Sequence, residues 1–315
     1  KKILIYLSER SNDFSFLIKK KQNVEIKNIK YDLTFFEKIK IIFFILKNDI
    51  SKVYILTPKS FYFLLPLLFK NTKFYGLCVD GPNKYKRPNE FLRKHLFKYI
   101  VNDRAAIFKR DSTTKIQNEL TTDTDIDDNF KFSVNIEKSN FLKKHLPDEY
   151  IYFHLKKKTI DKLNWQIQDL NKLFNKFLNH YKHVVFTKDI EKDSISDSFR
   201  KNYNVLDFSS QEYFKKNNNI FFFDNIEGEN LYNTIKYSSK VIAFHGMMTN
   251  LASLEKKPVL DLWYCNLKNW DSYRSCRNAF YEFKPRYKGY DFIIPSKNFA
   301  KTIRKIEHSL NKKLN

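Results

Sequence analysis

The stretch "YSSKVIAFHGMMTNLASLEKKPVLDLW", residues 237–263, holds one of only five glycines among 315 residues. The apolar run "KVIAF" leads into His245 and Gly246, and a helix is predicted to begin near Thr249 and Asn250. A second apolar run, "KPVLDLW", follows that helix. Strand, glycine turn, helix and strand in this order predict a parallel α/β arrangement.

The turn at Gly246 is also a candidate ligand site. Such a turn presents backbone N–H groups and the positive end of a helix, which suits a phosphate or a carboxylate. Glycine would let a ligand approach the main chain closely, although an ordinary strand-to-helix turn also needs one glycine. Thr249 and Asn250 are expected to donate to phosphate or to cap the helix. His245 either contacts a diphosphate or sugar, or is a structural residue.

The same alternation of strands and helices extends along the rest of the chain. Further strands are expected at 1–8, 52–58, 73–80, 150–155, 183–187 and 219–225. The segment 61–69 suits a crossover helix interrupted near Pro66. The alternation restarts after Pro147, and the length favours two domains. We therefore expect domains at 1–146 and 147–297, and a terminal helix, 298–315, that packs back on the first.

The composition limits the kinds of binding partner but does not indicate which reaction the protein catalyses. Lys and Arg number 58 against 35 Asp and Glu, a net charge of +23 that attracts phosphates, nucleic acid or anionic lipid. The basic residues are spread along the chain without an RNA-binding signature, so no nucleic acid partner is expected. The longest apolar runs are shorter than the ~20 residues of a membrane span. The three cysteines lack metal-ligand spacing and fit reduced thiols in the cytosol.

The run "NIEGENLYNTIKYSSKVIAFHGMMTNLASLEKKPVLDLW" resembles the C-terminal half of the heptosyltransferase-like glycosyltransferases, the ADP-heptose:lipopolysaccharide transferase family. The segment 162–187, "KLNWQIQDLNKLFNKFLNHYKHVVFT", is similar to that family's K-x-W-P segment, and "ILIYLSERSNDFSF" resembles its opening. The resemblance implies an α/β GT-B fold, in which two Rossmann-like lobes with parallel sheets face a cleft. It implies an enzyme that moves a sugar from a nucleotide-sugar donor to a bacterial lipopolysaccharide or capsule.

The resemblance also assigns roles to single residues. Asp13 falls on the family's acidic residue near the acceptor hydroxyl, and is the expected base. The donor phosphates would be bound by Lys162 and by the turn residues His245, Gly246, Met247, Thr249 and Asn250. Phe244 and His245 stand where the family has Asp and Ser, which argues against ADP-heptose itself as the donor.

A second carboxylate competes for the role of base. Asp80 in "CVDGPNKY" resembles the acidic Asp-Gly motif of bacterial sialyltransferases, and His154 falls where those enzymes have His-Pro. The alternative is therefore a sialyltransferase- or Kdo-transferase-like enzyme that uses a CMP-sugar, with His154 on the donor. Asp-Gly is also a common turn dipeptide. For an anionic glycan or glycolipid acceptor, the expected cations are Arg10, Arg87 and Arg93, whose alternative is a solvated surface.

Glycosyl transfer requires a base for the acceptor hydroxyl and stabilisation of the phosphate leaving group. The second half has no Asp-x-Asp pair, and no Glu-x7-Glu pair follows Glu149. We therefore predict an inverting displacement without a metal or cofactor. The basic helix at 35–47 is expected either to pack on the first sheet or to lie on an anionic membrane. Binding of this helix to a membrane predicts a cytoplasmic protein that is peripheral at the inner face of the membrane. The alternative to an enzyme is a non-catalytic protein that binds nucleic acid or anions.

Overall fold

The computed structural model describes residues 3–8, 24–30, 32–56, 60–80, 90–103, 119–120, 136–189, 194–265, 276–277, 280, 284–285 and 287–311. The chain divides into two compact units. Unit 1 comprises Lys1–Phe130 and Asn266–Lys284, and unit 2 comprises Lys131–Cys265 and Pro285–Asn315. The boundary therefore lies upstream of the expected residue 146, and a late segment returns to the first unit.

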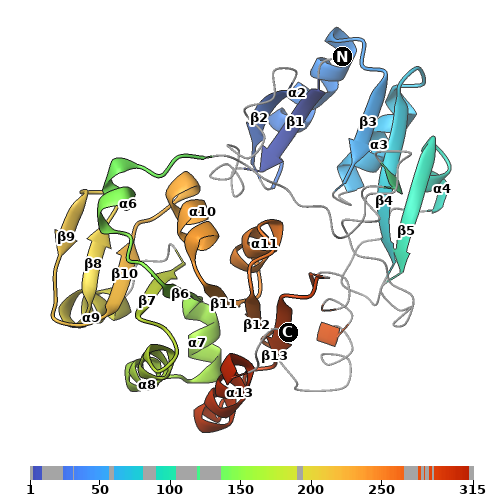
Figure 1. Ribbon diagram of the computed structural model, residues 1–315. Helices are drawn as coiled ribbons and strands as arrows, with labels where there is room; N and C mark the ends of the chain where they lie inside the picture. Colours follow the sequence, from blue (N-terminus) through green and yellow to red (C-terminus); the bar gives the residue numbers. More distant parts are fainter. Residues whose placement is uncertain are drawn as a thin grey trace. The chain divides into compact units, whose positions relative to one another are not determined.

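Unit 1 contains two small parallel sheets (Figure 1). One pairs β1 (Ile3–Ser8) with β2 (Val24–Ile29), and the other has the order β3 (Lys52–Ile55), β4 (Lys73–Asp80), β5 (Lys98–Asp103). The described helices are α2 (Phe35–Lys47), α3 (Ser60–Leu68) and α4 (Glu90–Arg93). The strands predicted at 1–8, 52–58 and 73–80 are confirmed as β1, β3 and β4, whereas β2 and β5 are not predicted by the sequence. The predicted break near Pro66 is wrong, because α3 continues through a buried Pro66 in its last turn.

Unit 2 is built on one eight-stranded sheet with the order β13-β12-β11-β6-β7-β10-β8-β9. Its strands are β6 (Tyr150–Leu155), β7 (His183–Lys188), β8 (Asn204–Asp207), β9 (Glu212–Phe214), β10 (Ile220–Asp224), β11 (Lys240–Phe244), β12 (Val259–Leu262) and β13 (Tyr290–Ile293). The pairing of β9 with β8 is antiparallel, and the other pairings are parallel. The four central strands are almost continuously apolar because helices cover both faces.

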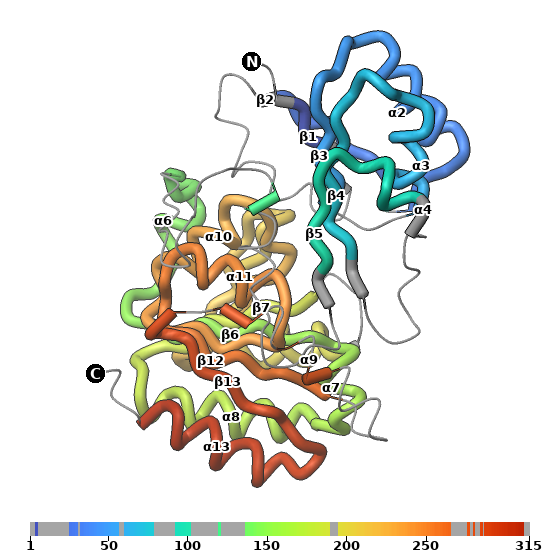
Figure 2. Tube along the Cα trace, turned by 90° about the vertical axis from the view of Figure 1, so that its right-hand side faces the viewer, coloured from blue at the N-terminus to red at the C-terminus, as the bar shows by residue number. Residues whose placement is uncertain are grey.

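Helices lie on both faces of this sheet (Figures 1 and 2). One face packs on α7 (Lys157–Leu163), α8 (Ile167–Leu178), α9 (Ser194–Asn202) and α13 (Phe299–Asn311), around a core that includes Phe153, Phe174, Phe186 and Phe244. The other face carries α10 (Gly228–Tyr237) and α11 (Met247–Leu254). α6 (Asn140–His145) lies beside α10, where Ser139 bonds to Asn230.

The terminal helix α13 belongs to unit 2. α13 packs against α8 and β13, and Lys176 of α8 pairs with Glu307 at 2.8 Å. Ile306 of α13 is fully buried in the core of unit 2. These described contacts lie in the second unit, and the packing of this helix on the first domain stays a prediction.

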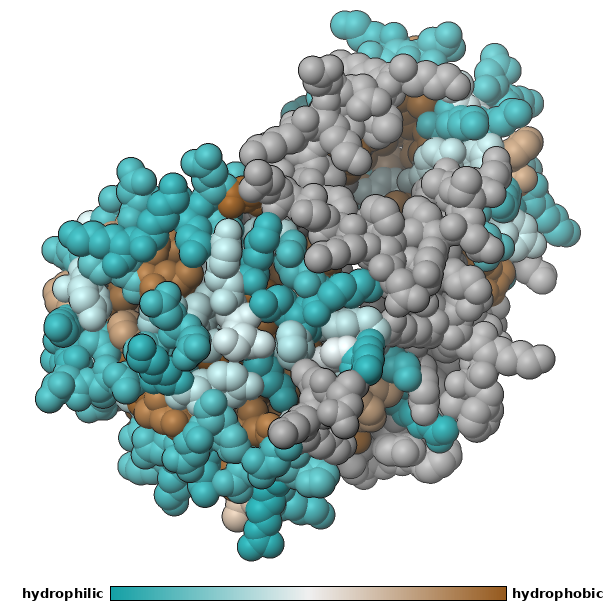
Figure 3. All heavy atoms as spheres, in the orientation of Figure 1, coloured by the Kyte–Doolittle hydropathy of each residue, from teal (hydrophilic) through white to brown (hydrophobic). Residues whose placement is uncertain are grey.

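Cys265 and Cys276 are disulfide-bonded, which contradicts the expected reduced thiols, whereas Cys78 is a buried thiol as expected. None of the described helices is long and apolar enough to cross a membrane. On the face drawn in Figure 3, hydrophilic side chains dominate the described surface, with smaller apolar patches between them.

Candidate functional site

The turn after β11 consists of His245 and Gly246. Gly246 is the N-cap of α11, with φ of +155° and ψ of −146°. Only glycine adopts this region of backbone conformation readily. A Cβ at this position would also collide with Nζ of Lys156. The backbone conformation therefore requires glycine, and any Cβ here would in addition have to displace the flexible end of Lys156.

Lys156 follows the last residue of β6, the strand next to β11. Its Nζ donates to the backbone oxygen of His245. Burial lowers the pKa of Lys156, while the nearby carboxylates of Asp261 and Asp189 act in the opposite direction. The lysine thus places a partly desolvated cation beside Gly246.

His245 is held by a fully buried carboxylate. Its Nδ1 lies 2.7 Å from Oδ2 of Asp261, whose side chain is 0% exposed. The hydroxyl of Tyr290 donates to the same oxygen at 2.8 Å, and Thr249 makes a longer contact of 3.4 Å with Oδ1. The ring of His245 packs on Trp263 with centroids 3.5 Å apart. Because Nδ1 is engaged, Nε2 is the nitrogen left for a ligand, and no other described residue bonds to it.

Strand register explains how these residues come together. Asp261 pairs with Ala243, which pairs with His154, which pairs with Thr187. Paired residues in a parallel sheet point to the same face, here the face that carries α10 and α11. His245 lies two residues beyond Ala243 and so continues on that face toward Asp261. The small Ala243 separates two polar groups, Asp261 with His245 on one side and His154 with Thr187 on the other.

The helix that begins at Gly246 adds main-chain donors to the turn. The first intrahelical bond runs from Asn250 N to Gly246 O at 3.1 Å, so the N–H groups of the first turn have no partner inside the helix. These N–H groups and the helix dipole favour an anion. The ammonium of Lys156 and Nε2 of His245 lie at the same turn. The arrangement is suited to bind a phosphate group.

The start of the neighbouring helix α7 differs from that of α11 because it has a carboxylate cap. Both carboxylate oxygens of Asp189 accept from the backbone N–H of Lys157, at 3.1 and 3.2 Å. α7 is therefore capped by the protein itself. Lys162, the predicted phosphate cation, lies in the last turn of α7. It is exposed, and its Nζ is 5.9 Å from the ring of Tyr264, two residues beyond β12. A role for Lys162 on the donor stays a prediction.

His154, the other predicted donor ligand, is buried in the sheet. Its Nδ1 lies 2.9 Å from Oγ1 of Thr187, which also bonds to the hydroxyl of Tyr152 at 2.6 Å. Burial, together with the positive charge of Lys156, lowers the pKa of His154 to about 3. His154 is consequently a neutral, hydrogen-bonded residue at neutral pH.

The remaining predicted residues have different outcomes. Met247 is 39% exposed at the first position of α11, and Asn250 is exposed one turn later. Thr249 is fully buried with its hydroxyl turned to Asp261, so its side chain helps to hold the carboxylate that binds His245.

The other predicted residues belong to unit 1. Asp80 is the last residue of β4 and lies opposite Asp103 in the strand register, and Arg93 is half-buried in α4. Three predicted residues lie outside the described residues: Arg10, Asp13 and Arg87.

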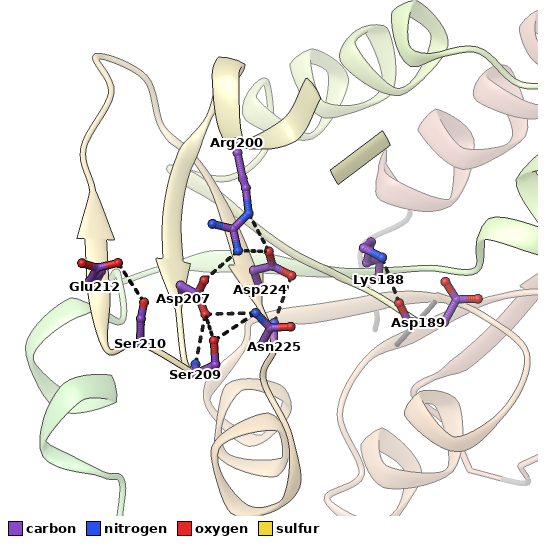
Figure 4. A network of polar contacts seen from close by, with 9 residues as sticks. All are labelled: Lys188, Asp189, Arg200, Asp207, Ser209, Ser210, Glu212, Asp224 and Asn225. Carbon is purple, nitrogen blue, oxygen red and sulfur yellow. Dashed lines mark hydrogen bonds and ion pairs between the residues drawn. The ribbon is translucent and has the colours of Figure 1, made fainter. Parts of the chain in front are cut away.

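A second polar cluster lies at the ends of β8 and β10 (Figure 4). Arg200 of α9 donates to Asp207 and Asp224, each at 2.6 Å. Asp207 also accepts from Ser209 and Asn225, and these bonds hold its pKa well below the usual range. The carboxylates are thus occupied by the protein's own donors, which indicates a structural role. In the described ranges, no three His, Cys, Asp or Glu side chains form a group able to hold a metal ion.

Sequence reasoning missed Lys156 and Asp261. Lys156 begins the run "KKK" at 156–158, in which nothing distinguishes the first lysine from the others. Asp261 did carry a signal, since it is the only acid within the apolar run "PVLDLW". Its partner Tyr290 is distant in sequence and belongs to a strand that was not predicted.

No protein-family model matches the sequence, and no curated protein is similar to it. Solved structures are nevertheless similar in fold. The ADP-heptose LPS heptosyltransferase II of E. coli has 13% identity and a TM-score of 0.65, over 98% of this chain and 88% of that one. The glycosyl transferase family 9 protein of Veillonella parvula has 13% identity and a TM-score of 0.60, with the same coverage. The UDP-GlcNAc 2-epimerase of Methanocaldococcus jannaschii has 14% identity and a TM-score of 0.52, over 100% of this chain and 94% of that one. The chain therefore has the GT-B fold that the sequence resemblance implied.

Proposed function

We propose that the protein is a glycosyltransferase whose unit 2 binds the diphosphate of a nucleotide-sugar donor at the Gly246 turn. One observation carries the proposal: a partly desolvated Lys156, an imidazole held by buried Asp261 and the start of α11 meet at one glycine. Charge builds on the phosphate leaving group during transfer, and these groups are placed to stabilise it. The similar structures include an enzyme named for ADP-heptose, which supports a nucleotide-sugar donor.

The rest of the proposed mechanism follows from the sequence. Asp13 removes the proton of the acceptor hydroxyl, with Asp80 as the alternative base. Transfer is inverting and requires no metal, and Lys156, His245 and the α11 N–H groups neutralise the leaving group. The acceptor is a bacterial surface glycan or glycolipid, bound at Arg10, Arg87 and Arg93, at the inner face of the cytoplasmic membrane.

A thermal-shift screen against ADP-, GDP-, UDP- and CMP-sugars tests the donor site. We expect at least one nucleotide sugar to raise the melting temperature of the full chain, because a ligand that binds only the folded state stabilises it. Lys156→Met should abolish most of that shift. Lys162→Met is the matched control, an exposed lysine six residues further along the chain in the last turn of α7, and should retain the shift if Lys156 is the phosphate cation. No shift with any nucleotide sugar would refute the donor site.

Transfer must also be distinguished from epimerisation, since a UDP-GlcNAc 2-epimerase has a similar fold. The donor found in the screen should release its nucleotide when a glycan acceptor is added, and the sugar should appear on the acceptor. An epimerised nucleotide sugar would instead show that the protein isomerises its ligand. If Asp13→Ala and Asp80→Ala both keep full transfer activity, the two base assignments fail.

A further inference from the structure

The helix α2 of unit 1 has one face that the fold buries. Ile41 and Ile45 are 7% exposed and pack in the core of unit 1 with Phe63 and Phe74. A capping box formed by Thr34 and Glu37 fixes the start of the helix. The burial of Ile41 and Ile45 fixes which face of α2 points away from the core.

The opposite face of α2 is apolar and positively charged. Phe36 is 73% exposed, Phe43 65% and Leu46 63%, which is unusual for such large apolar side chains on one helix. Lys40 and Lys47 are exposed on the same side, because positions 36, 40, 43 and 47 follow helical spacing. We call these five residues the outer face of α2.

Within α2 itself, no acidic side chain lies on this face. The one acid of α2, Glu37, accepts from Thr34 N at 2.7 Å and from Thr34 Oγ1 at 2.9 Å. It also accepts from the backbone N–H of Lys30 at 3.3 Å. These bonds hold Glu37 at the start of the helix and lower the pKa of its carboxyl group. The outer face therefore combines three large apolar side chains with two lysines that form no ion pair with the described residues of unit 1.

We propose that the outer face of α2 docks on an anionic lipid surface. Aromatic and leucine side chains would enter the boundary between headgroups and acyl chains, while the two lysines reach lipid phosphates. The charge favours this occupant over an apolar protein partner, because an apolar interface would desolvate both lysines without pairing them. The proposal concerns a surface of unit 1 and does not depend on the donor site of unit 2.

Vesicle co-sedimentation of the full chain tests the proposal. We expect binding to vesicles that mix phosphatidylcholine with phosphatidylglycerol, weak binding to phosphatidylcholine alone, and partial release in 0.5 M salt, which screens charges. Lys40→Gln with Lys47→Gln should weaken binding roughly 25-fold, since each lysine near an anionic surface contributes about five-fold. Phe36→Ser with Phe43→Ser should weaken it about ten-fold or more, because both rings lose their burial in lipid.

Two controls keep the result specific to this face. Phe214 of β9, in unit 2, is 45% exposed, and Phe214→Ser should leave vesicle binding unchanged. The melting temperatures of the variants should equal that of the unaltered protein, because every substituted side chain is exposed. Equal binding to both kinds of vesicle, or full binding by the Phe36→Ser, Phe43→Ser variant, would overturn the proposal. A dimer in light scattering that dissociates only in the α2 variants would also overturn the proposal, because the outer face would then contact a second copy of the chain.

Discussion

Replacing Gly246 by alanine perturbs the candidate site at its centre. Alanine must adopt a backbone conformation that costs about 1–3 kcal/mol for a residue with a Cβ. Its Cβ would also displace the ammonium of Lys156 from the carbonyl of His245. A hydrogen bond to a charged group contributes about 1.5–3 kcal/mol, of which water recovers part because Lys156 is only half-buried. We therefore expect Gly246→Ala to lower the free energy of unfolding by about 2–4 kcal/mol.

Urea unfolding followed by tryptophan fluorescence measures this loss, since Trp165 and Trp263 are both buried in unit 2. Gly289→Ala is the matched control. Its φ is not positive, and the nearest atom to a new Cβ is a ring carbon of Tyr287 at 3.0 Å. We expect that control to cost less than about 1 kcal/mol.

A double-mutant cycle separates the two parts of the cost. In a Lys156→Ala background the collision disappears, so Gly246→Ala should cost only the backbone strain, and the two substitutions should couple by about 1 kcal/mol. The reasoning fails if Gly246→Ala costs no more than Gly289→Ala. It also fails if the cost is the same with and without Lys156, because the lysine would then not be packed on the glycine.

Three further predictions concern charge. Burial lowers the pKa of His154 from 6.5 to about 3, so between these pH values the unfolded chain binds a proton that the folded chain does not. The free energy of unfolding should therefore fall by up to about 4 kcal/mol as the pH drops from 6.5 toward 3. In urea titrations, His154→Gln should make this dependence of stability on pH weaker. Burial lowers the pKa of Lys156 below 10.5, so the lysine loses its charge as the pH rises toward that value. The affinity for pyrophosphate, measured by calorimetry, should fall over this range, whereas the affinity of Lys156→Arg should not change with pH. Arg200→Met should lower the free energy of unfolding in urea by about 1–2 kcal/mol, because it removes the cation that pairs with Asp207 and Asp224, while water screens the exposed end of the arginine. An unchanged unfolding midpoint would mean that the ion pairs contribute nothing to stability.

Local sequence predicted the central strands of unit 2 because each is a short, nearly unbroken apolar run. It did not predict β8 and β13, whose sequences "NVLD" and "YDFI" contain polar residues. Those polar residues are satisfied by partners that no local pattern reveals. The amide of Asn204, for instance, bonds to Asn218 and Ile220 on the chain returning to β10.

The candidate site was predictable in part for the same reason. A single glycine between a strand and a helix marks a turn, so Gly246 and its neighbours could be found from the sequence. The polar groups around the turn lie directly after β6 (Lys156), in β12 (Asp261) and in β13 (Tyr290), and only the pairing of these strands brings them together. Lys162 was the expected cation, yet the structure places Lys156 against the glycine.

The path of the chain through unit 2 limits how this protein can be divided. The first segment of the unit ends at Cys265, and the chain returns at Pro285 only after contributing a segment to unit 1. The returning segment supplies β13, the hydroxyl of Tyr290 on Asp261 and the buried Ile306 of α13. A fragment cut out as 131–265 would therefore have an uncovered sheet edge, and the carboxylate that holds His245 would lack one of its donors. No single cut of the chain can therefore separate unit 1 from unit 2, because the chain passes from one unit to the other three times.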